Sequence, residues 1–367
     1  MKSSVVIVGG GLAGLTAARH FHQAGIDFQL LEALDRLGGR ILSVDASGEM
    51  SDDGFDLGPS WFWPGMHSAM SYLVDDLGLP FFAQHSEGDR VFQRLHDEAP
   101  RRFPGIRQEP ESMRLIGGVG RIISALASEL PETRIQLGTR VTNVTLDGPA
   151  VEAGFVDAQG TARGLKAAHV LFALPPRVLE ASVVFTPALD TATARSWRDM
   201  PTWMAPHAKF FALYERAFWR DAGLSGMAQS LVGPLVEIHD ATTATGKAAL
   251  FGFVGVPARQ RASAGQDAII KASISQLACL FGPQANSPSA TLYKDWATDP
   301  LTATDEDIRA GGHPFSDGLA PVPGEWQNRI LLAGSEAGRR EPGYLSGAVE
   351  AAEYAVLEVL KLLEHTN

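Results

Sequence analysis

Apolar residues at the start of the chain form a short continuous run and then recur with helical spacing. Residues 5–8 are valine and isoleucine, which predicts a buried strand, and residues 12–24 have the pattern of a helix that ends at Gly25. Residues 28–31 predict a second strand. A strand, a helix and a strand in this order indicate an α/β fold with a doubly wound, largely parallel sheet.

The remainder of the chain predicts a mixture of strands and helices. A polar, arginine-rich passage at 84–108 has no clear period, so surface loops are expected there. Elsewhere the pattern predicts strands at 135–137, 141–146, 151–156, 170–174, 248–256 and 329–333, and helices at 68–77, 121–130, 268–281 and 347–363.

Composition narrows the class of protein. The chain has 367 residues, of which 45% are apolar, so it can bury more core than one typical domain holds. A net charge of −11 opposes binding to a phosphate backbone, so nucleic acid is not an expected partner. No run approaches the ~18 apolar residues of a membrane span, and we expect a cytoplasmic enzyme. The single cysteine, Cys279, has apolar neighbours and is expected in the core.

A glycine-rich turn follows the first strand. Residues 9–14 read Gly9-Gly10-Gly11-Leu12-Ala13-Gly14, which is the G-x-G-x-x-G pattern of a dinucleotide-binding site in the required strand-turn-helix context. Gly9 permits the tight turn, Gly11 lets the backbone approach a pyrophosphate, and Gly14 allows close packing of the helix. The second strand ends in Glu32, whose carboxylate can accept hydrogen bonds from ribose hydroxyls.

The turn alone leaves FAD and NAD open as cofactors, because both contain the same ADP half. The following segment, residues 31–40, ends in Gly38-Gly39-Arg40 and resembles the extended signature of the flavin-containing amine oxidase family, which includes the monoamine and polyamine oxidases. The resemblance implies FAD, with Gly39 and Arg40 at its pyrophosphate. A fixed guanidinium fork suits a buried diphosphate.

The C-terminal region resembles the same family. Residues 332–337 and 342–351 are similar to its flavin-closing segment, in which a helix that begins near Gly347 directs its N-terminus at the reduced ring. Further stretches between the two ends resemble the family's flavin loop at 56–61, its adenine strand at 140–142 and its active-site lysine and tryptophan. By this resemblance the cofactor site includes Gly58, Pro59, Ser60, Trp61, Val141, Gly334, Ser335, Glu336 and Leu345, together with Ala13 of the turn, and the catalytic residues are Lys209, Tyr344 and Trp296.

The resemblance also implies a division into two domains. The FAD-binding domain, of Rossmann-like type, is expected to comprise 1–67, 112–187 and 313–367, and the substrate domain, a mixed sheet with helices, 68–111 and 188–312.

Two departures from the family affect the substrate site. The segment between Gly65 and Gly117 is shorter than in the monoamine oxidases, so helices that roof their substrate cavity are missing. The cysteine and tyrosine that those enzymes carry after the conserved tryptophan are absent from 302–307 in an alignment without gaps. This predicts non-covalent FAD and an incomplete aromatic cage, whereas a shifted alignment places His313 nearby. The sequence leaves both alignments open.

The resemblance implies oxidation of an amine to an imine or carbonyl, with oxygen giving hydrogen peroxide. Tyr344 would orient the amine and Lys209 would position a water. Structural roles remain open for these residues: Lys209 on a solvent face, Tyr344 in helix packing and Trp296 in the core. Open alternatives for the protein are a desaturase or porphyrinogen-type oxidase of the same superfamily, a flavin-binding partner without turnover, and an NAD-dependent dehydrogenase. The ten histidines have no metal-ligand spacing, so no metal site is predicted.

Overall fold

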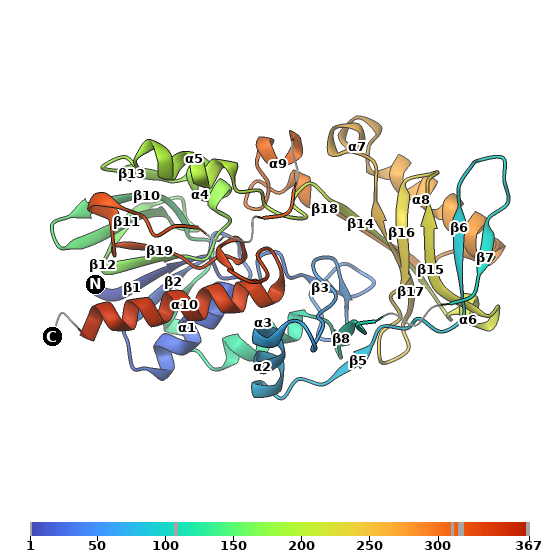
Figure 1. Ribbon diagram of the computed structural model, residues 1–367, viewed down its shortest axis with the longest axis horizontal. Helices are drawn as coiled ribbons and strands as arrows, with labels where there is room; N and C mark the ends of the chain where they lie inside the picture. Colours follow the sequence, from blue (N-terminus) through green and yellow to red (C-terminus); the bar gives the residue numbers. More distant parts are fainter. Residues whose placement is uncertain (1, 106–108, 310–311, 315–318, 365–367) are drawn as a thin grey trace.

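The structure is a computed structural model that describes residues 2–105, 109–309, 312–314 and 319–364. Two sheets lie side by side along its long axis, each with its own helices (Figure 1). Both chain ends lie on the body that contains the first sheet. None of the helices among these residues is long and apolar enough for a bilayer span.

In the described residues, eight strands form the first sheet, in the order β13-β10-β11-β12-β1-β2-β9 with β19 also paired to β12. The strand β1 (Lys2–Val8) lies at its centre, parallel to both β2 (Phe28–Leu31) and β12 (Ala162–Phe172). Its Val5, Val6 and Ile7 are fully buried, which explains the uninterrupted apolar run. The other strands are β9 (Ile135–Gln136), β10 (Arg140–Asp147), β11 (Ala150–Val156), β13 (Val184–Thr186) and β19 (Ile330–Leu332).

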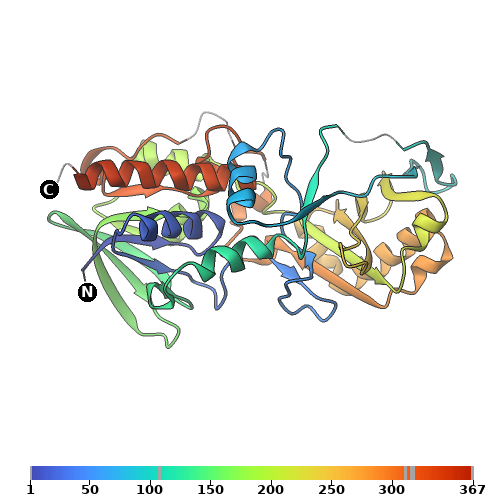
Figure 2. The same cartoon turned by 90° about the horizontal axis from the view of Figure 1, so that it is seen from below.

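Helices cover both faces of this sheet, as expected for a doubly wound fold (Figures 1 and 2). On one face α1 (Leu12–Gln23) packs against α10 (Leu345–Glu364), and α3 (Gly120–Ser128) packs beside α1. On the other face lie α4 (Pro176–Ser182) and α5 (Thr191–Asp199), whose Trp197 is buried in the core beneath the sheet.

Seven strands of the described chain form the second sheet, in the order β18-β14-β17-β16-β15-β6-β7. The helix α8 (Gln266–Phe281) covers one of its faces. The strands are β6 (Asp89–Gln93), β7 (Arg101–Phe103), β14 (Ala208–Tyr214), β15 (Leu224–Ser230), β16 (Leu235–Asp240), β17 (Ala248–Val254) and β18 (Ala290–Asp295). The shorter helices are α6 (Phe218–Asp221), α7 (Ala258–Ala264) and α9 (Asp305–Arg309).

Short elements connect the two sheets. They are α2 (Ser68–Asp76), the paired strands β3 (Ser43–Val44) and β4 (Phe55–Asp56), and the paired strands β5 (Phe81–Ala83) and β8 (Met113–Leu115). Single 3₁₀ turns occur at Glu132–Arg134, Pro283–Asn286, Trp296–Thr298, Gly324–Trp326 and Ser335–Ala337.

The expectation of loops throughout 84–108 was wrong, because β6 and β7 extend the edge of the second sheet. In β6 the buried positions are Val91 and Gln93. Because one of these buried residues is polar, the sequence lacks the alternation of apolar and polar residues that would predict a strand. The side chains of β7 are all exposed, as is common on an edge strand, and carry no apolar pattern.

The expectation that Cys279 lies in the core was also wrong. It is exposed on α8, where Gln93 Nε2 approaches its Sγ at 3.5 Å. The buried stripe of α8 runs through Ile269, Ser273, Gln276, Leu277 and Leu280. Position 279 falls to one side of this stripe, which the apolar residues next to it in the sequence do not reveal.

Candidate active site

The glycine-rich turn has the geometry that its sequence predicts. Gly9 has a φ of +106°, and a Cβ on Gly14 would lie 1.9 Å from the carbonyl oxygen of Gly9. Any larger residue at 14 would therefore push α1 away from β1. By contrast, a Cβ on Gly11 would come no closer than 3.7 Å to another residue. Space is thus kept open in front of Gly11 at the start of α1, where free N–H groups favour an anion.

Glu32 lies beside this turn and is buried. Its carboxylate accepts hydrogen bonds from the backbone N–H groups of Gly10, at 2.5 Å, and Leu34, at 2.8 Å. Burial raises the pKa of this carboxyl group, while the two backbone donors act in the opposite sense. The side chain also lines the main cavity, so its oxygens are placed for a ribose at the end of β2.

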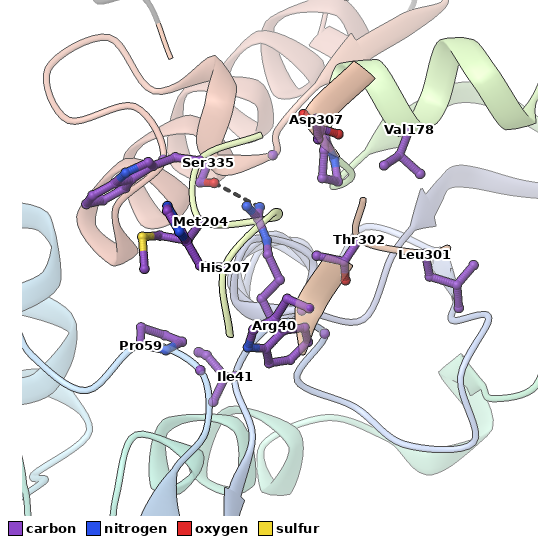
Figure 3. Close-up of a pocket in the computed structure, with 18 of the residues that line it drawn as sticks. Arg40, Ile41, Pro59, Val178, Met204, His207, Leu301, Thr302, Asp307 and Ser335 are labelled. Carbon is purple, nitrogen blue, oxygen red and sulfur yellow. Dashed lines mark hydrogen bonds between the residues drawn. The ribbon is translucent and has the colours of Figure 1, made fainter. Parts of the chain in front are cut away.

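Arg40 joins the two ends of the chain. One Nη atom lies 2.6 Å from Glu336 Oε1, and the other donates to Ser335 Oγ at 3.0 Å (Figure 3). Glu336 has no exposed surface, whereas about a third of the Arg40 side chain, 30%, is exposed. The neighbouring Arg36 donates to the carbonyls of Leu37, Gly39 and Ile41 and so holds the turn that presents Arg40. No motif in the sequence marks Arg36 for this role.

A single cavity of about 780 Å³ connects these features with the second sheet. Its volume is within the range of cofactor and ligand pockets. Figure 3 shows Arg40 in this cavity, with Met204 and His207 on one side and Thr302 and Leu301 on the other. The predicted site residues that line it are Gly9, Gly11, Ala13, Glu32, Gly39, Arg40, Gly58, Pro59, Ser60, Trp61, Val141, Lys209, Trp296, Gly334, Ser335, Tyr344 and Leu345.

Two predicted site residues lie outside the lining. Gly14 packs against Gly9. Because it has no side chain, the backbone of α1 can approach the turn closely. Glu336 lies behind Arg40 and contacts it instead of the cavity. Each of these two residues contacts a cavity-lining residue and does not line the cavity itself. A sequence motif does not distinguish such a residue from one that lines the cavity.

The loop at 56–60 crosses the cavity and is held from the second sheet. Lys209 Nζ donates to Gly58 O at 2.6 Å, to Ser60 Oγ at 2.9 Å and to Asp56 O at 3.2 Å. Trp296 Nε1 donates to Leu57 O at 3.0 Å. In its charged form the ammonium group has three protons for these three acceptors, so Lys209 positions the loop.

Lys209 is one of the most unusual charged groups in the protein. It is only 5% exposed, and its Nζ lies 4.7 Å from the ring centroid of Phe251 and 5.4 Å from that of Phe253. Burial lowers the pKa of this lysine to about 7, the nearby Arg114 also lowers it, and the carboxylate of Asp56 opposes the shift. The prediction that Lys209 lies on the inside of its strand is confirmed; a place on a solvent face is excluded.

Tyr344 belongs to an aromatic cluster at the start of α10. Its ring centroid lies 4.6 Å from Trp203, 5.1 Å from His67 and 5.4 Å from His313. Burial lowers the pKa of His67, which favours a neutral ring behind Tyr344. His313 thus lies beside Tyr344, as the shifted alignment expects, but it is exposed and does not line the cavity. Trp203 and His67 were missed because isolated aromatic residues in irregular segments form no sequence pattern.

The start of α10 is shaped by glycine. The helix begins at Leu345, two residues before the predicted start, and a Cβ on Gly347 would lie 2.0 Å from Glu341 O. The absence of a side chain there lets the turn at 338–343 cross the helix closely. Because Leu345 and Tyr344 both line the cavity, the N-terminal end of α10 borders it.

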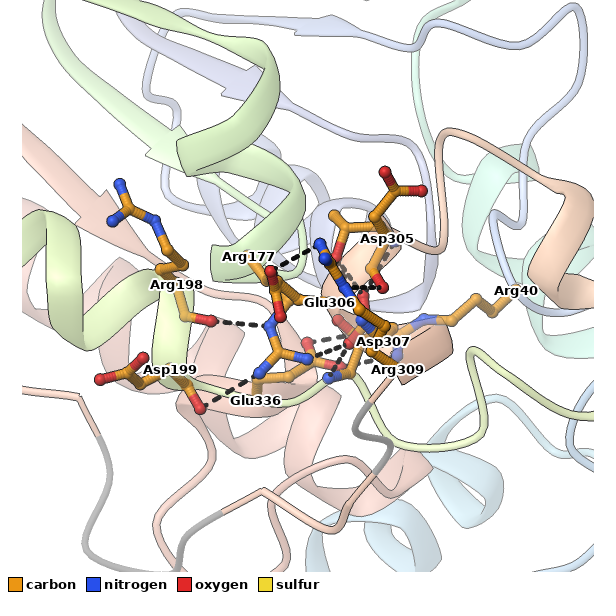
Figure 4. Close-up of polar contacts among 11 residues, drawn as sticks. Arg40, Arg177, Arg198, Asp199, Asp305, Glu306, Asp307, Arg309 and Glu336 are labelled. Atoms are coloured by element: carbon orange, nitrogen blue, oxygen red, sulfur yellow. Dashed lines mark hydrogen bonds and ion pairs between the residues drawn. The ribbon is translucent and has the colours of Figure 1, made fainter. Parts of the chain in front are cut away.

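A buried ion pair supports another wall. Arg177 on α4 lies 2.6 Å from Asp307 on α9, with 8% and 0% of their side chains exposed. Figure 4 shows Arg177 against Asp307. Asp307 also accepts hydrogen bonds from the backbone N–H groups of Thr202 and Thr304. This network fixes the segment that carries Trp203. Sequence analysis did not find it, because the partners come from segments more than a hundred residues apart.

The Arg40 and Glu336 contact gives a first testable prediction. Glu336→Gln keeps the size of the side chain but leaves Arg40 without its anionic partner, so we expect the protein without FAD to lose about 1.5–3 kcal/mol of unfolding free energy. Added FAD should then raise the unfolding midpoint more than in the wild type, because its diphosphate no longer competes with a carboxylate.

Urea unfolding with and without FAD measures both effects. The exposed Glu325, in the Gly324–Trp326 turn, provides the control Glu325→Gln, which should change neither. An equal gain from FAD in Glu336→Gln and wild type would contradict the assignment of Arg40 to the cofactor.

Comparisons with known proteins agree with this arrangement. The family model described as "Flavin containing amine oxidoreductase" matches residues 12–113 and 105–360. The two matched pieces overlap at residues 105–113, inside the stretch 65–117.

The chain is 24% identical to "Probable flavin-containing monoamine oxidase A" of Dictyostelium discoideum, with 95% of each chain covered. It is 28% identical to "L-amino acid dehydrogenase" of Synechocystis sp., over 70% of this chain and 53% of that protein. A solved structure of wild-type putrescine oxidase bound to putrescine has a TM-score of 0.81 at 19% identity, covering 98% and 99% of the two chains, and so shares the fold. The family match spans most of the chain, and the chain therefore belongs to the flavin-containing amine oxidoreductases, whose cofactor is FAD.

Proposed function

We propose that this protein is an oxidase that uses non-covalently bound FAD to convert an amine to an imine or carbonyl, with oxygen as the electron acceptor. The observation that carries the proposal is the continuous cavity. It leads from Glu32 and the glycine-rich turn, past Arg40, to Lys209 and Tyr344. A dinucleotide site and a set of aromatic and amine side chains thus share one cavity.

The residues present fit FAD. Open space in front of Gly11, the guanidinium of Arg40 and the N-terminal end of α1 suit a diphosphate. The border formed by Leu345 at the start of α10 suits the part of the ring that gains negative charge. The one cysteine of the chain, Cys279, does not line the cavity, which supports non-covalent binding.

FAD supplies an acceptor for the hydride of a C–H bond next to nitrogen, and oxygen takes the electrons onward as hydrogen peroxide. The protein's part is to bind and orient. Tyr344 and Trp203 provide flat aromatic surfaces for the amine, and Lys209 and Trp296 hold the loop at 56–60 beside it. Lys209, with a pKa near 7, can also exchange a proton with an ordered water at neutral pH.

We also propose a small change in the division into domains. The helix α2, predicted in the substrate domain, places Met70, Leu73 and Val74 in the core beneath the first sheet and packs against α10. We therefore assign it to the FAD-binding domain and start the substrate domain after residue 77. A cytoplasmic location stays a prediction.

The experiment is an amine panel assayed for peroxide, combined with anaerobic titration of the holoenzyme. We expect at least one amine to bleach the flavin absorption band without oxygen and to give peroxide with oxygen. Bleaching by other reductants but by no amine would overturn the proposal in favour of a different oxidation. A flavin that no small substrate reduces would indicate a binding protein without turnover.

A further inference from the structure

One face of the second sheet borders the cavity. It carries a lysine, Lys209, on β14 and a glutamate, Glu237, on β16. The register pairs Lys209 of β14 with Phe253 of β17, and Phe253 with Glu237 of β16. Side chains of directly opposed residues lie on the same face of a sheet, so these three form one row. The next row is Phe211, Phe251 and His239, whose rings stack at 5.2 Å and 5.4 Å.

Glu237 is placed to receive a ligand. It lines the main cavity, and 47% of its side chain is exposed. Its Oε1 lies 2.6 Å from Nε2 of His239, and this hydrogen bond lowers the pKa of the carboxyl group. Glu237 also borders a second cavity of about 280 Å³, which opens between β6, β15 and β16. The carboxylate is thus both anionic at neutral pH and reachable.

Another acidic residue that lines the cavity is already neutralised. Asp307 has no exposed surface and is paired with Arg177. Among the described residues, the ion pair of Glu237 is with His239, and no lysine or arginine pairs with it. A carboxylate without a permanent cation, in a cavity that accepts amines, favours a cationic ligand group.

The distance between the two ends of the row suits a substrate with two functional ends. Two strand spacings of about 4.8 Å separate the backbones of Lys209 and Glu237, roughly 10 Å in total. Apolar rings fill the interval, since Trp61 lies 6.3 Å from Phe253 and 4.8 Å from His239. An alkyl chain can pack on these rings while its ends reach different polar groups.

We propose that Glu237 binds a second cationic group on the substrate, so that the preferred substrates are α,ω-diamines or related amines with a distal positive charge. This inference rests on the proposed function, because Lys209 and the loop at 58–60 mark the end where oxidation occurs. Glu237 then determines specificity through a group remote from the reacting bond.

The kinetic test compares 1,4-diaminobutane with butylamine in wild type and Glu237→Gln. Glutamine keeps the hydrogen bond to His239 but not the charge. We expect KM for the diamine to rise by roughly 10- to 100-fold, the range for loss of a bond to a charged group, with a much smaller change for butylamine. Glu358→Gln, at a half-buried position of α10 outside the cavity lining, is the control and should change neither value. An unchanged preference for the diamine in Glu237→Gln would overturn the proposal.

Charge reversal and direct binding make the test independent of turnover. Glu237→Lys should shift preference from the diamine to 4-aminobutanoate, whose distal end is negative. Calorimetric titration of the anaerobic holoenzyme with the diamine should show binding to wild type that is weakened in Glu237→Gln. Binding with this dependence but no oxidation would refute the proposed function alone, whereas oxidation of amines without this dependence would refute the role of Glu237 alone.

Discussion

Gly11→Val is expected to yield a folded protein that has lost FAD. A Cβ at this position meets no atom of another residue within 3.7 Å, so the polypeptide can accept the larger side chain. The added methyl groups occupy the space in which a diphosphate would approach the start of α1. We expect the dissociation constant for FAD to rise by at least about 100-fold, which corresponds to about 2.7 kcal/mol.

The measurement combines the flavin content of the purified protein, titration with FAD and circular dichroism. Gly65→Val is a matched control, because its Cβ also meets nothing within 4 Å and Gly65 does not line the cavity. Gly14→Ala provides the contrasting case: its Cβ would overlap Gly9 O, so it should lower stability by about 1–3 kcal/mol before FAD is added. Normal FAD binding by Gly11→Val would refute the assignment of this turn to the cofactor.

Lys209→Met should retain FAD and lose most amine turnover. Methionine fills a similar volume but donates no hydrogen bond, so Asp56 O, Gly58 O and Ser60 Oγ all lose their shared donor. The loop that carries them borders the reacting end of the cavity. A misplacement of about 1 Å there costs on the order of 100-fold in rate, and we expect kcat to fall by at least that factor.

The same variant tests the titration of Lys209. Its pKa lies at about 7 in the folded protein and near 10.5 when unfolded. Between these values the unfolded chain binds the additional proton, so this lysine makes the folded state more stable as the pH rises from 7 to 10.5. Subtracting the unfolding free energies of Lys209→Met from those of wild type at each pH should reveal this increase.

Lys271→Met, on the exposed face of α8, is the control for both measurements and should match wild type. Full turnover by Lys209→Met would show that the loop keeps its position without the lysine. A flat stability difference between pH 7 and 10.5 would show that Lys209 keeps an ordinary pKa in the folded protein.

The parts that sequence predicts well are those in which a local pattern has one physical cause. The turn at 9–14 must combine a positive φ at Gly9 with close packing at Gly14, and only glycine satisfies both. The apolar run of β1 and the helical spacing of apolar residues in α1 likewise predict these two elements directly. Lys209 and Arg40 were found through their resemblance to a family, since no local pattern marks a buried cation.

The parts that sequence does not predict depend on contacts between distant segments. Nothing in the neighbourhood of Trp203 indicates that its ring meets Tyr344, 141 residues later in the numbering, at 4.6 Å. The position of Glu237 in the cavity follows from strand register and a bulge in β16, and neither can be read from a single chain. Only residues 170–172 of β12 were predicted as strand, because its first three residues, Ala162, Arg163 and Gly164, are exposed and form no apolar run.

The contact between Arg40 and Glu336 has a consequence for how the protein is made. The first strand-turn-helix leaves the ribosome long before β19 and α10 are synthesised, yet it needs the last segment to complete the cavity wall. During most of translation, the glycine-rich turn and Arg40 are therefore present without Ser335 and Glu336, the residues that contact Arg40 in the folded protein. The cofactor site can therefore be completed only after Ser335, Glu336 and α10 have been synthesised, and the early segment alone lacks the contact that fixes Arg40.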